Sequence, residues 1–283
     1  MKTRIISGVV MIIITAAVIA AGMLINPLII TAFIAFIAAV GIYELLHNAA
    51  GVKSKAALIG ACAYVALMAF VIDGSTGVKL PTVFGGTDSA YIKLTFTLAL
   101  GVIYFIYSAA VTLKNHKTFT LSHIAFVCGM PIPIAFAFSS LGVVINHAHG
   151  LYYLLMLLNF SSVCDMGAYF VGSTLGKHKL CPNISPHKTV EGAVGGIISS
   201  IIVTCILGFS FSFEKNLINA VILTVPFCIL GMIGDLFASA IKRASGIKDY
   251  GTLIPGHGGI LDRFDSILMI APLLYLFITL GVI

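Results

Sequence analysis

Long, nearly uncharged apolar runs are the feature that most constrains this chain. A membrane-crossing helix needs about 20 mostly apolar residues, and such stretches fall at 5–25, 28–46, 56–72, 92–113, 121–145, 151–175, 190–211, 217–241 and 266–283. Only 9% of the 283 residues are charged and the mean hydropathy is +1.10, whereas soluble domains are roughly a quarter charged. Because the runs are continuous rather than alternating, a transmembrane β-barrel is disfavoured. The sequence predicts an all-α, polytopic bundle of about nine transmembrane helices.

Three local features refine this prediction. Pro131 and Pro133 fall inside the fifth stretch and predict a kink there. The first stretch follows Lys2 and Arg4 as in a signal peptide, but its apolar part is longer than is typical, so we expect a retained helix. The six cysteines form no CxxC pair, and we expect them to pack as small apolar side chains rather than bind metal or form disulfides.

The placement of lysine and arginine predicts the orientation in the membrane. With the N-terminus in the cytoplasm and nine spans, 13 of the 16 basic residues fall on the inner side, as the positive-inside rule requires. The remaining three are Lys79, Lys93 and Lys215. A cell-membrane protein with a cytoplasm-facing site is therefore expected. The net charge of +6 then reflects loop bias or an anionic substrate, and no nucleic-acid partner is expected.

Three longer connections divide the chain by function. The connection 73–91 is predicted to be a solvated outer loop, while 176–189 and 242–265 lie inside and hold the unusual residues. We therefore expect residues 1–150 to form an N-terminal scaffold of lipid-facing helices. Residues 151–283 are expected to form the catalytic region.

The densest chemistry lies in residues 239–265, which read SAIKRASGIKDYGTLIPGHGGILDRFD. Seven of the chain's 26 formal charges sit in these 27 residues, together with His257. Glycines around the histidine, including Gly258 and Gly259, let backbone N–H groups approach a ligand and form an anion-binding nest. Beside lysines and arginines, such a turn favours a phosphate ligand, although a solvated charged loop remains the alternative. The candidate charged residues of this segment are Lys242, Arg243, Lys248, Asp249, Asp262, Arg263 and Asp265.

Two acids, Asp165 and Asp235, lie inside apolar stretches near the expected cytoplasmic ends. A carboxylate in a membrane costs about 2.5–3.5 kcal/mol at the centre and is usually functional. The inner segment GKHKLCPNISPHKTVEG (176–192) supplies Ser185 in a turn, Lys188 and Glu191 in the first turn of the next helix. Thr189 is expected to cap that helix, and Gly192 and Gly196 to let it pack closely on a neighbour.

Carboxylates beside phosphate-binding groups indicate Mg²⁺, which takes oxygen ligands and commonly bridges phosphates. Electrostatic stabilisation and positioning are most of what phosphoryl-type transfer requires. GSTLGK (172–177) lacks the spacing of a phosphate-binding P-loop, and no GxSxG or HExxH pattern occurs. Hydrolase and zinc peptidase functions are therefore disfavoured.

Residues 239–265 resemble the signature of the phosphatidate cytidylyltransferases, the CDP-diacylglycerol synthases. The matching positions are Ser239, Ile241, Lys242-Arg243, Lys248-Asp249, His257-Gly258-Gly259-Ile260 and Asp262-Arg263-Phe264-Asp265. DMGAYFVG (165–172), SPHKTVEG (185–192) and Gly234-Asp235 resemble upstream motifs of that family. Ala238 departs from the pattern, where many members carry a polar residue. The motifs cover roughly the last 120 residues.

The resemblance implies transfer of CMP from CTP to phosphatidic acid, giving CDP-diacylglycerol and pyrophosphate, in a membrane homodimer. It implies Mg²⁺, with K⁺ as an example of a second cation, and assigns the metal to Asp235 and Asp262. We then expect Lys242, Arg243, Lys248 and Arg263 to offset phosphate charge, and Gly258 and Gly259 to bring backbone donors to the substrate. Asp165, Asp249 and Asp265 would orient cations, and Ser185, Lys188 and Glu191 would serve substrate binding. His257 is either a hydrogen-bond donor in catalysis or a structural residue.

Two other functions remain open from the residues alone. A secondary transporter would use Asp165 and Asp235 as cation or proton relays, although the dense charge in the loops and the lack of a repeat disfavour it. A CTP-dependent membrane lipid kinase would use the same substrates and cleave a different bond.

Overall fold

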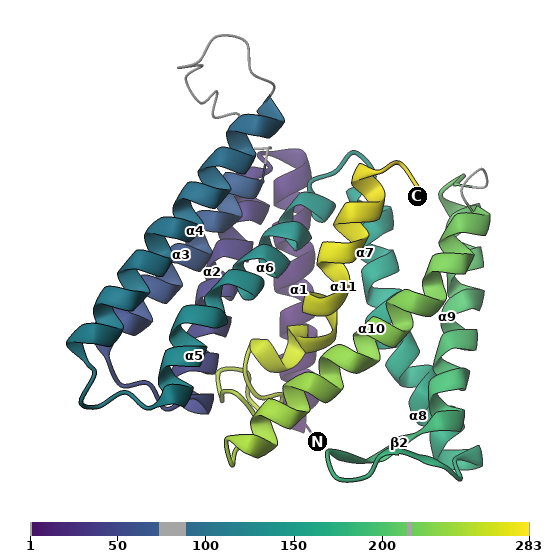
Figure 1. Cartoon of the computed structure of the whole chain (residues 1–283). Helices are drawn as coiled ribbons and strands as arrows, with labels where there is room; N and C mark the ends of the chain where they lie inside the picture. Colours follow the sequence, from purple (N-terminus) through teal and green to yellow (C-terminus); the bar gives the residue numbers. More distant parts are fainter. Residues whose placement is uncertain (1, 74–88, 214–216, 283) are drawn as a thin grey trace. The chain divides into compact units, whose positions relative to one another are not determined.

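The computed structural model describes residues 2–73, 89–213 and 217–282 and is helical along most of them (Figure 1). Most of the predicted solvated connection 73–91 lies outside the described residues, as do Lys79 and Lys215. Asp73, at the start of this connection, is buried and bonded to Asn146, so the solvated prediction is wrong for this residue. The chain forms two compact units. The first unit comprises residues 1–146 and 249–263, and the second unit comprises residues 147–248 and 264–283.

The first unit is a helical bundle centred on one helix, α3, which packs against α2, α4 and α6 (Figure 1). Its core contains Ile42, Leu46, Val65 and Phe138, each fully shielded from solvent. A π-helical turn, η1, continues α2. The elements of this unit are α1 (Lys2–Leu24), α2 (Leu28–Glu44), η1 (Leu45–Ala49), α3 (Lys55–Ile72), α4 (Ser89–Lys114), α5 (Leu121–Gly129) and α6 (Pro131–Ile145).

The helix is interrupted at the prolines, because α5 ends at Gly129 and α6 begins at Pro131, while the predicted kink stays a prediction. Proline lacks the N–H that would continue the helix ladder, so a break at this position follows from its chemistry. At its start, α5 is fixed by a capping box in which Thr120 and His123 each satisfy the other's backbone N–H.

In the second unit, the helices α8 and α9 pack closely against each other because small residues line their contact. A Cβ at Gly192 would meet the Ala168 carbonyl, and one at Gly196 would meet the Cys164 carbonyl. The predicted packing role of both glycines is thus confirmed. The elements are α7 (Gly150–Leu158), the π turn η3 (Asn159–Val163), α8 (Cys164–Leu175), β1 (Lys179–Cys181), β2 (Ser185–Thr189), α9 (Val190–Ser210), α10 (Leu217–Ala244) and α11 (Leu261–Thr279), whose first three residues belong to the first unit.

A short antiparallel hairpin, β1 paired with β2, occupies part of the predicted inner connection. Ser185, which was predicted to lie in a turn, begins strand β2 instead. Lys179 pairs with Thr189, and Cys181 pairs with Ser185. This hairpin leads directly into α9, and the Thr189 hydroxyl accepts the Gly192 N–H at 3.1 Å. The predicted cap is therefore present.

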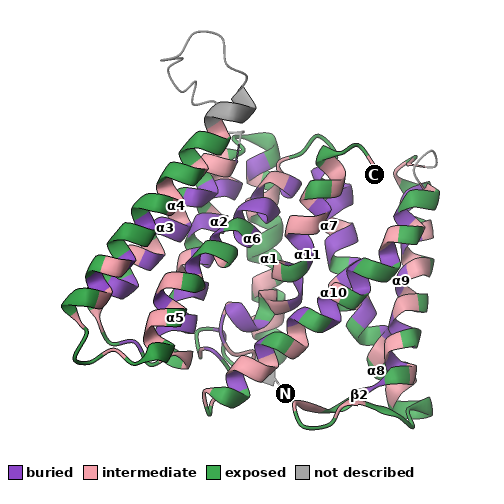
Figure 2. Ribbon diagram, in the orientation of Figure 1, coloured by how far each residue is buried: buried purple, intermediate pink, exposed green. Residues whose placement is uncertain are grey.

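Eight helical stretches of the described residues are long and apolar enough to cross a membrane. The ninth, α11, carries Asp262, Arg263 and Asp265 in its first turns. On α9, Ile198, Ile202 and Ile206 are exposed and spaced by four residues, so they form an apolar outer stripe. Figure 2 shows exposed and intermediate residues along this helix. The all-α, multi-pass membrane fold is confirmed, and all six cysteines are free thiols.

Candidate active site

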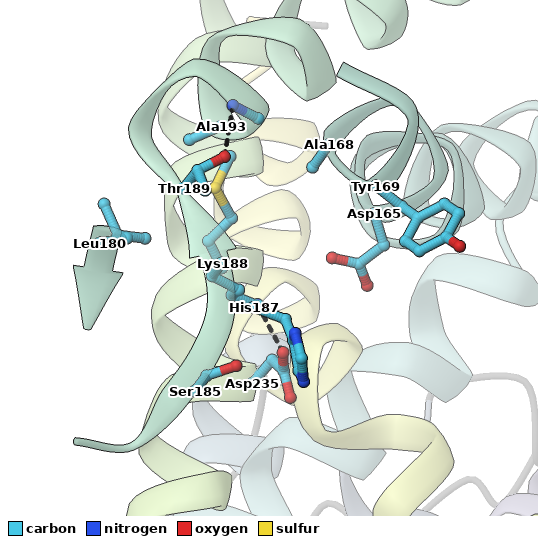
Figure 3. Close-up of a pocket in the computed structure, with 12 residues that line it drawn as sticks. Asp165, Ala168, Tyr169, Leu180, Ser185, His187, Lys188, Thr189, Ala193 and Asp235 are labelled. Atoms are coloured by element: carbon cyan, nitrogen blue, oxygen red, sulfur yellow. Dashed lines mark hydrogen bonds and ion pairs between the residues drawn. The ribbon is translucent and has the colours of Figure 1, made fainter. Parts of the chain in front are cut away.

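A pocket of about 290 Å³ in the second unit gathers several of the predicted site residues (Figure 3). Its wall comes from α8, the β1–β2 hairpin, α9 and α10. Of the predicted residues, Asp165, Ser185, Lys188 and Asp235 line it. These residues span 71 positions of the sequence, so the fold brings the DMGAYFVG and SPHKTVEG segments and the Gly234-Asp235 pair to one place.

Two of the residues that line this pocket form an ion pair. The Lys188 Nζ is 2.5 Å from the Asp235 Oδ2, and both side chains are about one-quarter exposed (Figure 3). Lys188 extends from β2, whose pairing with β1 fixes its direction. In such a pocket, the lysine can bind a phosphate and the carboxylate can bind a cation.

Asp165 brings a second carboxylate to the pocket from the second residue of α8. It lies within electrostatic reach of both Lys188 and Asp235. The preceding π turn is held to α9 by Asn159, whose amide donates to the Ser200 carbonyl and the Thr204 hydroxyl at 3.0 Å each. This anchor sets the start of α8 and with it the position of Asp165.

Asp265 and Lys242 extend the charged cluster within the second unit. Their charged atoms are 4.0 Å apart, and Asp265 also lies within electrostatic reach of Asp235 and Asp165. The helices α10 and α11 come close here because Gly234 has no side chain. A Cβ at Gly234 would meet the Asp265 carbonyl.

Other predicted residues of the second unit lie away from the pocket lining. Glu191 accepts N–H groups from Lys177 and His178 and pairs with the His178 ring at 2.5 Å, so it braces the start of the hairpin. Arg243 and Lys248 are exposed where α10 ends. Gly246, with φ +69°, closes that end by a bond from the Ile247 N–H to the Lys242 carbonyl.

The glycine-rich part of the signature belongs to the first unit and folds back on Asp262. This side chain is 7% exposed, and its Oδ2 accepts the N–H groups of Tyr250 at 2.8 Å and Gly259 at 2.9 Å. The Gly259 N–H, which we expected to face a phosphate, is donated inside the loop instead. Gly256 and Gly258 have φ of +79° and +86°, so the predicted left-handed turn is present.

His257 is tied to the first helix. Its Nδ1 lies 2.8 Å from the Ser7 hydroxyl, which also bonds the Pro255 carbonyl at 2.9 Å. Of the two roles considered for His257, this contact supports the structural one. Asp249 and Arg263 are exposed at either side of the loop.

The two predicted metal ligands, Asp235 and Asp262, belong to different units, so their joint ligation stays a prediction. In the part of the chain that the structure describes, no three His, Cys, Asp or Glu side chains are grouped as a metal site. The donor chemistry of the pocket nevertheless suits Mg²⁺, which is commonly held by one or two carboxylates together with substrate phosphates. Asp165 and Asp235 supply two such carboxylates.

Sequence analysis missed three residues of interest. Tyr169 and His187 line the pocket, and both fall within the motif segments that were compared with the family. Glu44 is buried in the second apolar stretch. The argument that singled out Asp165 and Asp235, an acid within an apolar run, applies equally to Glu44 and could have found it.

Comparison with known proteins shows similarity along the whole chain. The sequence model of the cytidylyltransferase family matches residues 2–280. A phosphatidate cytidylyltransferase of Staphylococcus epidermidis (strain ATCC 35984) is 33% identical over 275 residues, which is 97% of either chain. The phosphatidate cytidylyltransferase of Bacillus subtilis (strain 168) is 39% identical over 184 residues, or 65% of this chain and 68% of that protein.

Proposed function

This chain belongs to the cytidylyltransferase family, and from that membership we propose that it transfers CMP from CTP to phosphatidic acid. The products are CDP-diacylglycerol, a precursor for phospholipids, and pyrophosphate. The observation that carries the proposal is the match over residues 2–280, together with a phosphatidate cytidylyltransferase that aligns over 97% of the chain. The charged pocket in a membrane-spanning unit supports it, because the reaction joins a water-soluble nucleotide to a membrane lipid.

The chemistry requires little covalent participation from the protein. An oxygen of the phosphatidate phosphate attacks the α-phosphorus of CTP, and the bond to the bridging oxygen of pyrophosphate breaks. The attacking oxygen is already an anion, so no strong general base is needed. The main barrier is repulsion between two anionic reactants, and fixed cations lower it.

Residues of the pocket supply this electrostatic function. Lys188 holds one phosphate, while Ser185 and His187, at the same wall, offer hydrogen bonds to its oxygens. Lys242, which pairs with Asp265, offsets charge on the nucleotide. Arg243, Lys248 and Arg263 are exposed and guide the triphosphate toward the site through long-range attraction.

Magnesium fits the donor set of the pocket, where Asp235 and Asp165 would be its protein ligands. The family motif also names Asp262 as a metal ligand. When bound, the ion offsets triphosphate charge and polarises the phosphorus under attack. Asp265 orients the neighbouring cations, and a second cation such as K⁺ would be held by the same acids. Asp165 and Asp265 keep these cations near Asp235 through their negative charge.

Location follows from the same proposal. CTP is cytosolic, so the site faces the cytoplasm and the protein lies in the cell (inner) membrane, as the distribution of basic residues indicates. Phosphatidic acid reaches the pocket from the inner leaflet. A homodimer is part of the same proposal, and its support is the family resemblance.

The test uses purified full-length protein in detergent with labelled CTP, phosphatidic acid and Mg²⁺. Formation of CDP-lipid and pyrophosphate in equal amounts supports the proposal. CDP with a newly phosphorylated lipid would identify a kinase, and no conversion of CTP would contradict any CTP-dependent activity. Omission of phosphatidic acid is the matched control, since it leaves the protein unchanged and should abolish pyrophosphate release.

A further inference from the structure

One buried acid of the first unit has no part in the proposed reaction. Glu44 ends α2 and is 4% exposed. A buried carboxylate costs free energy unless hydrogen bonds satisfy it. Its partners therefore indicate what the acid does.

The Glu44 carboxylate binds the start of α11, more than 200 residues further along the chain. Its Oε1 accepts the Ile260 N–H at 3.1 Å and its Oε2 accepts the Leu261 N–H at 3.0 Å. The first N–H groups of a helix have no partner within the helix, and a negative charge beside them is favourable. Both carboxylate oxygens thus accept backbone N–H groups from the two residues that directly precede Asp262 and Arg263.

Residues 250–261, the loop before Asp262, leave room for this carboxylate. A Cβ at Gly251, or one at Gly259, would meet the Glu44 carboxylate before any other group. These glycines keep φ outside the left-handed region, so their lack of a side chain serves the close approach of Glu44. The loop wraps around the acid from two sides.

Neighbouring contacts hold the same loop to the same helices. The Asn48 amide, in η1, donates to the Tyr250 carbonyl at 2.6 Å. Asp262 in turn accepts the N–H groups of Tyr250 and Gly259. Glu44 and Asp262 therefore share one hydrogen-bonded framework that runs from residue 250 to residue 262.

We propose that Glu44 is a positioning residue for nucleotidyl transfer, which fixes residues 250–261 so that Asp262 and Arg263 are presented in their working conformation. Glu44 acts through the loop and touches no substrate. The effect on turnover rests on the proposed function, whereas the effect on the loop does not.

The experiment compares Glu44→Gln with wild type, as full-length protein in detergent. A glutamine side chain has one acceptor oxygen, and its NH₂ group would face the second backbone N–H, so one of the two bonds is lost. We expect amide hydrogen exchange in residues 250–261 to accelerate by about tenfold or more, the factor that corresponds to one lost charge-assisted bond. We expect kcat to fall by about tenfold or more, with a much smaller change in KM for CTP, because positioning affects the transition state.

The matched control is Asp73→Asn, which converts another buried acid of the first unit to its amide. Asp73 bonds Asn146 at 2.7 Å and Thr31, and Thr31 lies 13 residues before Glu44 on α2, about 20 Å along the axis. This variant should lower thermal stability and leave both kcat and exchange in 250–261 near wild type. If Asp73→Asn and Glu44→Gln change kcat and exchange in residues 250–261 equally, Glu44 only stabilises the protein in general and does not position the loop.

The outcomes separate the two proposals. If amide hydrogen exchange in residues 250–261 is as slow in Glu44→Gln as in the wild type, the proposed role of Glu44 is wrong, whatever the activity. If exchange is faster but kcat is unchanged, Glu44 holds the loop and has no role in catalysis. Absence of CDP-lipid with wild-type protein contradicts the proposed function instead. Should Glu44→Gln fail to fold, Gly251→Ala retains the carboxylate and crowds it, and it should produce the same exchange and kcat effects.

Discussion

The Lys188 ammonium lies 2.5 Å from the Asp235 carboxylate, so the acid expected to hold a metal already has a cation partner from the protein. A divalent cation at Asp235 would compete with Lys188 for this carboxylate. The freed lysine would then face the pocket, where it can bind a substrate phosphate. If Asp235 binds Mg²⁺ and Lys188 binds the lipid phosphate, as proposed, the ion pair would link the two events, and each of its members can be tested separately.

Asp235→Asn should lower the rate of CDP-lipid formation by at least about 10²-fold, the scale of losing one key electrostatic group. The amide keeps the shape of the side chain and removes the charge that attracts Mg²⁺. The rate measured across a Mg²⁺ titration checks this, and removal of Mg²⁺ by a chelator should abolish wild-type activity. Near-normal turnover of the variant at ordinary Mg²⁺ would remove Asp235 from the metal site.

Lys188→Ala should lower kcat/KM for phosphatidic acid by about 10²-fold, because a phosphate loses its charge-assisted partner in the pocket. Kinetics with mixed micelles of varied phosphatidate content measure this effect. Lys117→Ala is the control, since it removes the same charge from an exposed position between α4 and α5. If both variants lose activity equally, the effect comes from net charge and not from the pocket.

Gly258→Ala should destabilise the protein more than Gly246→Ala, although both glycines have positive φ. An alanine in this conformation costs about 1–2 kcal/mol at either position. A Cβ at Gly258 would also meet the Asp262 carboxylate, whereas nothing lies within 4 Å of one at Gly246. Thermal unfolding in detergent should show the larger loss for Gly258→Ala, and equal losses would argue against the packing of Gly258 on Asp262.

Cysteine labelling tests the orientation. In a Cys181→Ser background, a reporter at Thr252 should resist a membrane-impermeant maleimide added to intact cells, because the positive-inside rule places it in the cytoplasm. A reporter at His149, in the connection between α6 and α7, should react. Both positions are exposed, so accessibility of the side chain is matched. Rapid reaction at 252 with protection at 149 would invert the proposed topology.

The helices could be predicted from the sequence because their signal is local. Each of the nine predicted apolar stretches corresponds to a helical segment of the described residues, and Pro131 interrupts the fifth, where its missing N–H requires a break. The pocket residues Asp165 and Asp235 could also be predicted, since a charge within an apolar run is visible in the sequence itself, and Lys188 could be predicted from the lysine-containing inner segment.

The remaining features depend on contacts between distant residues. The attachment of residues 249–263 to the first unit rests on Glu44 and Asn48, about 200 positions away, and no local pattern reveals such a pairing. The β1–β2 hairpin has only three and five residues in its strands, too few for a clear alternation of polar and apolar positions. Glu191 was predicted to serve substrate binding. In the structure it accepts the N–H groups of residues 177 and 178, and these bonds could not be predicted because they depend on the fold of the hairpin.

The π turn at Asn159–Val163 separates two helical registers that the sequence presents as one run. Each residue of an α-helix advances the direction of its side chains by about 100°, and a π turn accommodates one additional residue without breaking the helix. Because the surplus residue is absorbed within the turn, the helix after it keeps its facing, and Asp165 remains directed at the pocket that Lys188 also lines. The π turn thus lets Asn159 bind the neighbouring helix α9 without a change in the direction of the charged residues that follow.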